Sequence, residues 1–270
     1  MKQPKSMFRK EALLCFAAAL LVFGVCGCSQ QSSGQGSGIL GSIFAVSDHG
    51  ETDEQKAERE AEEAAEAQKQ AEEQAEKERK AAAKKIWETM DISKDYRKSF
   101  IHGEKPPEYQ KYIILHDTEG DGDAEVNINY WDGNGKGVAA HFVVNKDGSI
   151  VQAVKMDNLT HHAGFGGEGY NKKFGVIDES RDDKVGTSSS GGDYGMNSYS
   201  IGIEMVHVGN GSDYPKAQLE ALDKLISYID TYYGFESKII CHREWAPGNS
   251  DTSKEFDTYL ANYKDHRSYK

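Results

Sequence analysis

Short apolar runs separated by Gly and Asp characterise the chain from about residue 92 onward. The run 112–115 (YIIL) is continuously apolar, which is typical of a strand buried on both faces. Residues 238–241 (KIIC) predict a second buried strand, apolar after its first residue, and a histidine follows each run at once. In 201–206, by contrast, Ile, Ile and Met alternate with Gly, Glu and Val, which predicts a strand with two different faces.

A hairpin and a long helix complete the predicted elements. The runs 141–144 and 149–154 flank an Asp-Gly turn, the pattern of a β-hairpin. Leu and Ile recur at helical spacing between Pro215 and Gly234, residues suited to a helix start and a helix end. These elements predict an α/β (α+β mixed) fold with a central mixed β-sheet flanked by helices.

The segment 165–198 breaks this pattern. It is dense in Gly, Ser and Asp and is too long for an ordinary connection. We interpret it as a mobile insertion that shapes a substrate groove.

The first 28 residues resemble a lipoprotein signal peptide. Basic residues precede an apolar run, 12–25, which is shorter than the ~20 residues of a membrane-spanning helix. The run leads into Val25-Cys26-Gly27-Cys28, which resembles a lipobox, so Cys28 is the expected lipidation site. An uncleaved short anchor is the alternative. In both cases the rest of the chain is expected to be exported and held at the cell membrane, facing the cell wall.

Two segments separate this signal from the apolar runs. Residues 29–50 begin with only Ser, Gly and Gln, which predicts a flexible linker. Residues 51–91 are rich in Ala, Glu and Lys and predict a charged helical stalk. A coiled coil is the alternative, but the stalk has no Leu or Ile seam, so we favour a single-helix spacer. Residues 92–270 then form the expected catalytic domain.

The composition narrows the classes of function. The 270 residues carry 32 Lys+Arg and 44 Asp+Glu, a net charge of −12, which disfavours a general nucleic-acid binder. Three of the four cysteines lie within the first 28 residues, so a disulfide framework is excluded.

His116 and His242 directly follow two predicted buried strands, where ligands collect at the rim of a sheet. Two imidazoles and a carboxylate are typical of a catalytic zinc site. Glu244 and Asp251 both offer the carboxylate, and the loop suggested by 245–248 (WAPG) favours Asp251. Cys241 is interpreted as a core thiol, because adjacent strand residues face opposite sides.

Five blocks in one order carry a family resemblance: 112–118 (YIILHDT), 140–144 (AHFVV), 162–164 (HAG), 200–204 (SIGIE) and 242–248 (HREWAPG). Together they resemble the type 2 N-acetylmuramoyl-L-alanine amidases, which share the peptidoglycan-recognition-protein fold. The resemblance implies a zinc hydrolase that cuts the amide between N-acetylmuramic acid and L-alanine in peptidoglycan. In such an enzyme a zinc-activated water attacks the lactyl carbonyl, assisted by a glutamate.

By the same resemblance, His116, His242 and Asp251 match the metal ligands and Glu204 matches the catalytic glutamate. His162 matches a substrate-side histidine. The loop before Asp251 lacks the lysine that related enzymes often carry, so Arg243 or Asn249 is the expected substrate-binding donor. No role is predicted for His49, His102, His207 or His266. His141 is treated as a packed strand residue, and His161 is expected to face away from the site.

Three functions remain to be compared. The leading one is a lipid-anchored zinc amidase that acts on peptidoglycan. A non-catalytic peptidoglycan-binding module of the same fold is the second, and a structural lipoprotein with a vestigial domain is the third. Zinc content separates the last from the others, because a vestigial domain has no reason to keep a complete site.

Overall fold

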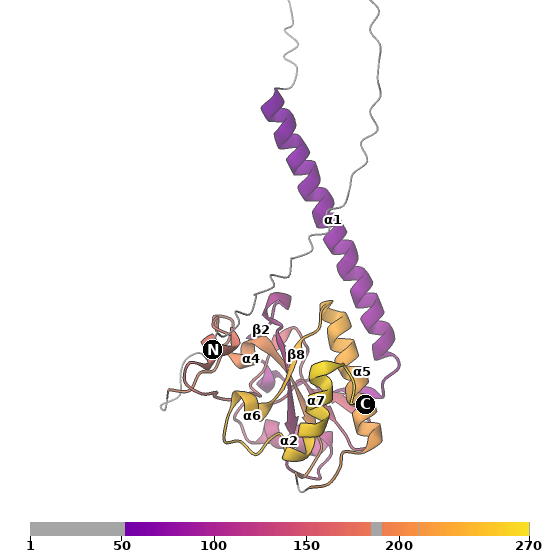
Figure 1. The fold of residues 1–270 in the computed structure, drawn as a ribbon, viewed down its shortest axis with the longest axis vertical. Helices are drawn as coiled ribbons and strands as arrows, with labels where there is room; N and C mark the ends of the chain where they lie inside the picture. Colours follow the sequence, from indigo (N-terminus) through magenta and orange to yellow (C-terminus); the bar gives the residue numbers. More distant parts are fainter. Residues whose placement is uncertain (1–51, 185–190, 210, 270) are drawn as a thin grey trace, which may run out of the picture. The chain divides into compact units, whose positions relative to one another are not determined.

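The computed structural model describes residues 52–184, 191–209 and 211–269 (Figure 1). The predicted signal segment with Cys28 and the linker up to residue 50 lie outside these described residues. Among the described helices, none combines the length and the apolar character that crossing a membrane requires.

A six-stranded mixed sheet forms the centre of the fold, as the sequence predicts. Its strand order is β1-β5-β4-β7-β3-β8, and only the β4–β5 pair is antiparallel. The strands are β1 (Ile92–Lys94), β3 (Tyr112–Asp117), β4 (Phe142–Val144), β5 (Ile150–Gln152), β7 (Ser200–Met205) and β8 (Lys238–Cys241). A separate antiparallel pair joins β2 (Gly103–Glu104) to β6 (Asn158–Leu159).

The strand patterns in the sequence correspond to these positions. All six residues of β3 are buried, because β7 and β8 flank it and both of its faces are covered. In β7, Ile201, Ile203 and Met205 enter the main apolar cluster. Alternation along the strand therefore turns Gly202 and Glu204 to the opposite face, where the candidate site lies. The predicted hairpin is the antiparallel β4–β5 pair.

Helices cover both faces of the sheet. On one face, α5 (Lys216–Tyr233) and α7 (Asp257–Asp265) contribute to the main apolar cluster. On the other, α4 (Met196–Tyr199) and α6 (His242–Trp245) pack with Ile114 and Ile240. Apart from α1, which is described below, the remaining helical elements of the described residues are α2 (Ala124–Gly133), α3 (Tyr170–Phe174) and three 3-10 turns, η1 (Lys98–Phe100), η2 (Pro107–Tyr109) and η3 (Lys254–Phe256).

The long helix α5 begins and ends where the sequence predicts. Pro215 is its N-cap, and Gly234 closes it with φ of +79° and an N–H that bonds the Asp230 carbonyl. A side chain is strained at this φ and would also meet Arg79 at 2.4 Å, so glycine is required here.

Helix α1 (Asp53–Trp87) is highly charged and carries ion pairs between residues four apart, such as Arg59–Glu63 at 2.9 Å. Each such exposed pair stabilises a helix by only about 0.3–0.5 kcal/mol. Its last turns pack against α5, since Ala83 is buried and the Trp87 ring contacts that of Tyr228 edge-on. Residues 53–270 therefore form one compact unit, and the expected boundary at residue 92 stays a prediction.

Within 165–198, the described residues contain α3 and α4 and are tied down by side-chain hydrogen bonds. Asn171 Oδ1, for example, accepts from the Gly195 N–H at 2.9 Å, and the Asn171 N–H donates to Asp193 Oδ2 at 2.7 Å. The predicted role of this segment in shaping a substrate groove stays a prediction.

Candidate metal centre

The topology brings the two predicted histidines together. His116 is the penultimate residue of β3, and His242 directly follows the neighbouring parallel strand β8 and begins α6. Because parallel strands end at the same edge of a sheet, the two rings lie 4.5 Å apart. One oxygen of Asp251, Oδ2, lies 2.9 Å from His116 Nδ1 and 2.8 Å from His242 Nδ1.

The loop that carries Asp251 is fastened to the end of β3. The Asp117 N–H donates to Asp251 Oδ1 at 2.5 Å, and the Ser253 N–H donates to the Asp117 carboxylate at 2.7 Å. The Thr252 hydroxyl donates to the Leu115 carbonyl. These bonds hold one carboxylate oxygen and leave Oδ2 facing the histidines.

Positive charge next to Asp251 keeps this carboxyl group ionised. Burial raises the pKa of Asp251, but positive charge on the His116 and His242 rings, with their hydrogen bonds, outweighs burial and lowers the pKa. Where the rings are neutral, a cation between the three side chains would supply this charge instead. Burial is also the main reason that the pKa of His116 is lowered, which favours its neutral form.

A chain of hydrogen bonds defines the tautomer of His116. The Ser200 hydroxyl donates to the Met196 carbonyl at 2.6 Å, so its oxygen accepts from His162 Nε2 at 3.1 Å. His162 Nδ1 then has a lone pair and accepts from His116 Nε2 at 3.0 Å. The proton of His116 is therefore on Nε2, and its Nδ1 lone pair points at Asp251.

The tautomer of His242 follows in the same way. Its Nε2 lies 2.9 Å from the Ala163 carbonyl, which only accepts, so Nε2 carries the proton. Two bare Nδ1 atoms and a carboxylate oxygen thus converge, an arrangement that is repulsive unless a cation lies between them. Ligands of tetrahedral zinc lie about 3.3 Å apart, so the donors fit zinc after an expansion of about half an ångström.

Glu204 lies beside this group. It pairs in parallel register with His116, so both side chains are on the same face of neighbouring strands. Its Oε2 is buried and has no hydrogen-bond partner among the described residues. Burial raises its pKa well above the ordinary value, and the negative charges of Asp251, Asp117 and Glu119 add to this. An unpaired carboxyl group is therefore available next to His116, His242 and Asp251, which together are called the candidate metal group below.

The other predicted residues lie around these four. His162 is buried behind His116 and uses both ring nitrogens within the protein, so its substrate-side role stays a prediction. The Asn249 amide lies 3.2 Å from His242 Nε2. The Arg243 guanidinium binds the Thr252 and Ser253 carbonyls and the Asp257 carboxylate. Arg243 and Asn249 also line a hollow of about 290 Å³ next to Asp117.

Two other side chains near His242, those of Glu244 and Cys241, contact different partners. Glu244 forms an ion pair with Lys264 at 2.9 Å, and Cys241 belongs to the main apolar cluster as expected. A larger hollow of about 520 Å³ contains none of the candidate residues, since residues of α1, β5 and α5 line it.

Sequence reasoning missed several supporting residues. Asn197 is fully buried, and its Oδ1 accepts from the N–H groups of His162 and Ala163 at 3.0 and 2.8 Å. Tyr214 donates to the Asp117 carboxylate at 2.6 Å. No local pattern marks these residues, because their partners lie 34 to 97 positions away in the chain.

A family model described as N-acetylmuramoyl-L-alanine amidase (Amidase_2) matches residues 104–255. The match spans more than half of the chain and contains His116, Glu204, His242 and Asp251. The chain belongs to this amidase family. The match runs from the end of β2 into η3, so the three candidate metal ligands and Glu204 all lie within it. No curated protein matches the chain.

Solved structures with a similar fold include other amidases. LysC from Clostridium intestinale URNW, an N-acetylmuramoyl-L-alanine amidase, is 15% identical with a TM-score of 0.44, over 64% of this chain and 96% of that one. A mutant endolysin from Bacillus subtilis is 17% identical with a TM-score of 0.45, over 66% and 98%. Bumblebee PGRP-SA is 12% identical with a TM-score of 0.43, over 64% and 95%.

Proposed function

We propose that this amidase hydrolyses the amide bond between N-acetylmuramic acid and L-alanine in peptidoglycan, with a zinc ion held by His116, His242 and Asp251. The proposal depends on one observation: two unprotonated imidazole nitrogens and a carboxylate oxygen converge within the segment that matches the family. Zinc in such a site lowers the pKa of a bound water to about 7 and polarises a carbonyl.

The side chains around the metal group supply the other functions. The positive charge of a bound zinc ion would favour the ionised form of Glu204, and Oε2, which has no hydrogen-bond partner among the described residues, would then accept a proton from the attacking water. Ser200 and His162 hold the His116 ring with Nδ1 facing inward. Arg243 and Asn249 contact the substrate from the adjoining hollow.

The N-terminal part sets the location of the enzyme in this proposal. Lipidated Cys28 anchors the exported chain in the cell membrane, and residues 29–50 connect this anchor to the described part of the chain. Helix α1, with 35 residues, is about 50 Å long and increases the distance over which the enzyme reaches the wall.

The direct test incubates the full chain with purified peptidoglycan and counts newly exposed L-alanine amino termini. We expect release that stops when zinc is removed with a chelator and returns when zinc is restored. Cleavage at a bond other than the lactyl amide would contradict the proposed specificity. Zinc binding without any release would instead identify the non-catalytic peptidoglycan-binding module.

Gly202→Ala tests the support behind His116. A Cβ at Gly202 would lie 2.5 Å from the His162 ring, so that ring must shift and His116 loses its partner. Loss of such a supporting bond costs about 10–100-fold in metal affinity, which competition with a chromophoric chelator measures. Gly133→Ala is the control, since a Cβ there meets nothing within 4 Å. Unchanged zinc affinity in Gly202→Ala would show that His162 does not position His116.

A further inference from the structure

A hollow of about 520 Å³ lies between the end of α1, the edge strand β1, the residues that follow β5, and α5. This volume falls within the range of sites for small organic ligands, roughly 300–1,000 Å³. One wall of the hollow consists of aromatic side chains, those of Trp87, Tyr96, Tyr228 and Tyr232. Tyr96 is 40% exposed, and the Trp87 ring contacts that of Tyr228 edge-on. The faces of such rings carry partial negative charge and attract the C–H groups of a sugar ring.

Lysines surround this aromatic wall. Four of them line the hollow, namely Lys80, Lys84, Lys94 and Lys155. The two on α1 pair with Glu76 and Glu88 of the same helix. Lys94 and Lys155 form no ion pair with a described residue, and their ammonium groups lie 5.0 and 5.8 Å from the centres of two of the aromatic rings. Asp157 is the one carboxylate among the lining residues, so the hollow has an excess of positive charge in a chain whose net charge is −12.

A nearly buried amide supplies a further donor. Gln152 lines the hollow and is 5% exposed, and it pairs with Lys94 in the parallel β1–β5 register. The Tyr96 hydroxyl donates to Gln152 Oε1 at 2.7 Å, while Nε2 of the same amide has no partner among the described residues. Since buried polar groups are normally hydrogen-bonded, this nitrogen is matched by an acceptor oxygen of a ligand in the hollow.

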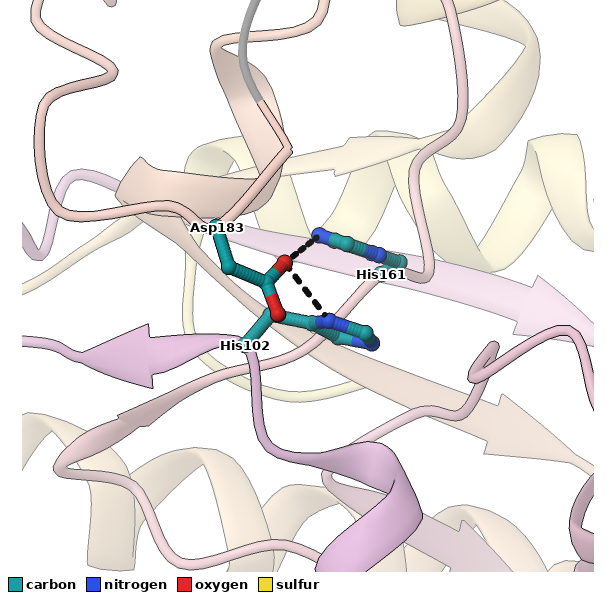
Figure 2. A group of neighbouring side chains, drawn as sticks. All are labelled: His102, His161 and Asp183. Carbon is teal, nitrogen blue, oxygen red and sulfur yellow. Dashed lines mark hydrogen bonds and ion pairs between the residues drawn. The ribbon is translucent and has the colours of Figure 1, made fainter.

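The histidine cluster in Figure 2 differs from this hollow, because its side chains are directed at one another. The rings of His102 and His161 stack at 3.4 Å with 11° between their planes. His102 Nδ1 lies 2.9 Å from Asp183 Oδ1, and its Nε2 lies 2.6 Å from the Gly137 carbonyl. His161 Nε2 lies 2.8 Å from Asp182 Oδ1. These contacts fasten the segment around Asp183 to the residues next to β2 and β6.

We propose that the hollow binds the glycan strand of peptidoglycan at muramic acid residues whose lactyl carboxylate is free. The sugar rings pack on the aromatic wall, and the Lys94 and Lys155 ammonium groups bind the carboxylate. The Gln152 amide donates to the acetamide carbonyl of the sugar. Aromatic wall, cationic rim and amide donor together match an acidic, N-acetylated sugar.

This inference rests on the proposed function, which produces the ligand. Hydrolysis of the lactyl amide consumes one water, leaves a carboxylate on muramic acid and releases the L-alanine nitrogen as an ammonium group. Each cleavage therefore creates a new ligand for the hollow on the same strand. Because a second contact raises the effective concentration of the enzyme at the polymer, the hollow retains the amidase on the strand that it is stripping.

The binding test uses the full chain and a tetrasaccharide of alternating N-acetylglucosamine and N-acetylmuramic acid without stem peptides. The neutral comparator is the tetrasaccharide of N-acetylglucosamine alone. Calorimetry is expected to show tighter binding of the acidic sugar. Lys94→Gln/Lys155→Gln is expected to weaken that binding by about 10-fold and to remove the preference for the acidic sugar. Tyr96→Ala is expected to weaken binding of both sugars, because stacking does not depend on the carboxylate.

Two control variants make the binding test specific. Lys98→Gln/Lys172→Gln removes the same charge from exposed lysines outside the hollow and is expected to bind as the unmodified chain does. Asp251→Asn alters the candidate metal group and is also expected to bind the acidic sugar unchanged. Equal binding of the two sugars would overturn the proposal. So would binding that Asp251→Asn loses and the Lys94/Lys155 variant keeps.

A second measurement tests retention on the strand. The Lys94/Lys155 variant is expected to keep the kcat of the unmodified chain on a soluble muramoyl-peptide and to release L-alanine termini more slowly from insoluble peptidoglycan. Equal rates on both substrates would overturn the retention. Release of termini by a chain that does not bind the acidic sugar would overturn this inference alone, whereas binding without release would support the hollow and contradict the proposed function. Binding to vesicles of anionic phospholipid in place of the sugar would overturn the proposal and assign the hollow to the membrane surface.

Discussion

Glu204→Gln is expected to lower kcat for release of L-alanine termini by about 10²–10⁴-fold while zinc content stays unchanged. The amide keeps the volume of the side chain but cannot accept a proton from the attacking water. Glu204 Oε2 makes no hydrogen bond among the described residues, so the substitution removes no structural contact of that atom. The measurement is the rate of release from purified peptidoglycan, with bound zinc determined on the same sample.

The control for this prediction is Glu125→Gln, an exposed carboxylate in the first turn of α2 that is not among the candidate site residues. Its rate is expected to match that of the unmodified chain. A Glu204→Gln variant that binds zinc and retains its rate would remove Glu204 from the reaction and leave the metal group without a base.

Asp251→Asn is expected to abolish release of L-alanine termini from peptidoglycan. It is also expected to weaken zinc binding at the site formed by His116, His242 and Asp251 by more than about 100-fold. Loss of even a supporting partner costs about 10–100-fold, and this substitution removes the negative charge that faces both histidines. Zinc competition with a chelator measures the affinity, and thermal unfolding shows whether the loop that Asp117 and Thr252 hold remains folded.

Glu244→Gln is the matched variant, because Glu244 is the other carboxylate that follows His242 closely in sequence. Its partner in the structure is Lys264, so zinc affinity and rate are expected to remain within about 2-fold of the unmodified chain, as is usual for surface substitutions. If Glu244→Gln lost zinc and Asp251→Asn kept it, the third ligand would be Glu244.

The fold could be predicted largely from local patterns. Each pattern indicates which faces of one element are buried. Examples are the apolar runs of β3 and β8, the alternation in β7 and the spacing of apolar residues in α5. Elements with weaker signals were missed, such as β1 and the β2–β6 pair. These strands have two or three residues each, and such short lengths carry no distinct periodicity.

Only part of the candidate site could be predicted from local sequence patterns. His116 and His242 were found because each follows a buried strand, and the structure confirms that these strands are neighbours. His242 lies in the first turn of α6 rather than in a strand or loop, a difference that turns Glu244 toward α7. His102 was given no role, because its partners His161 and Asp183 lie 59 and 81 residues further along the chain.

The sequence by itself determined the class of fold, the candidate metal ligands and the resemblance to the family, because burial patterns and short motifs are local properties. Only the tertiary structure decided which atoms face one another. The inward Nδ1 atoms of His116 and His242 depend on Ser200, His162 and the Ala163 carbonyl, which reach them through the packing of separate strands and loops. Donor direction and unpaired charge arise from such long-range packing, so they appear only once the chain is folded.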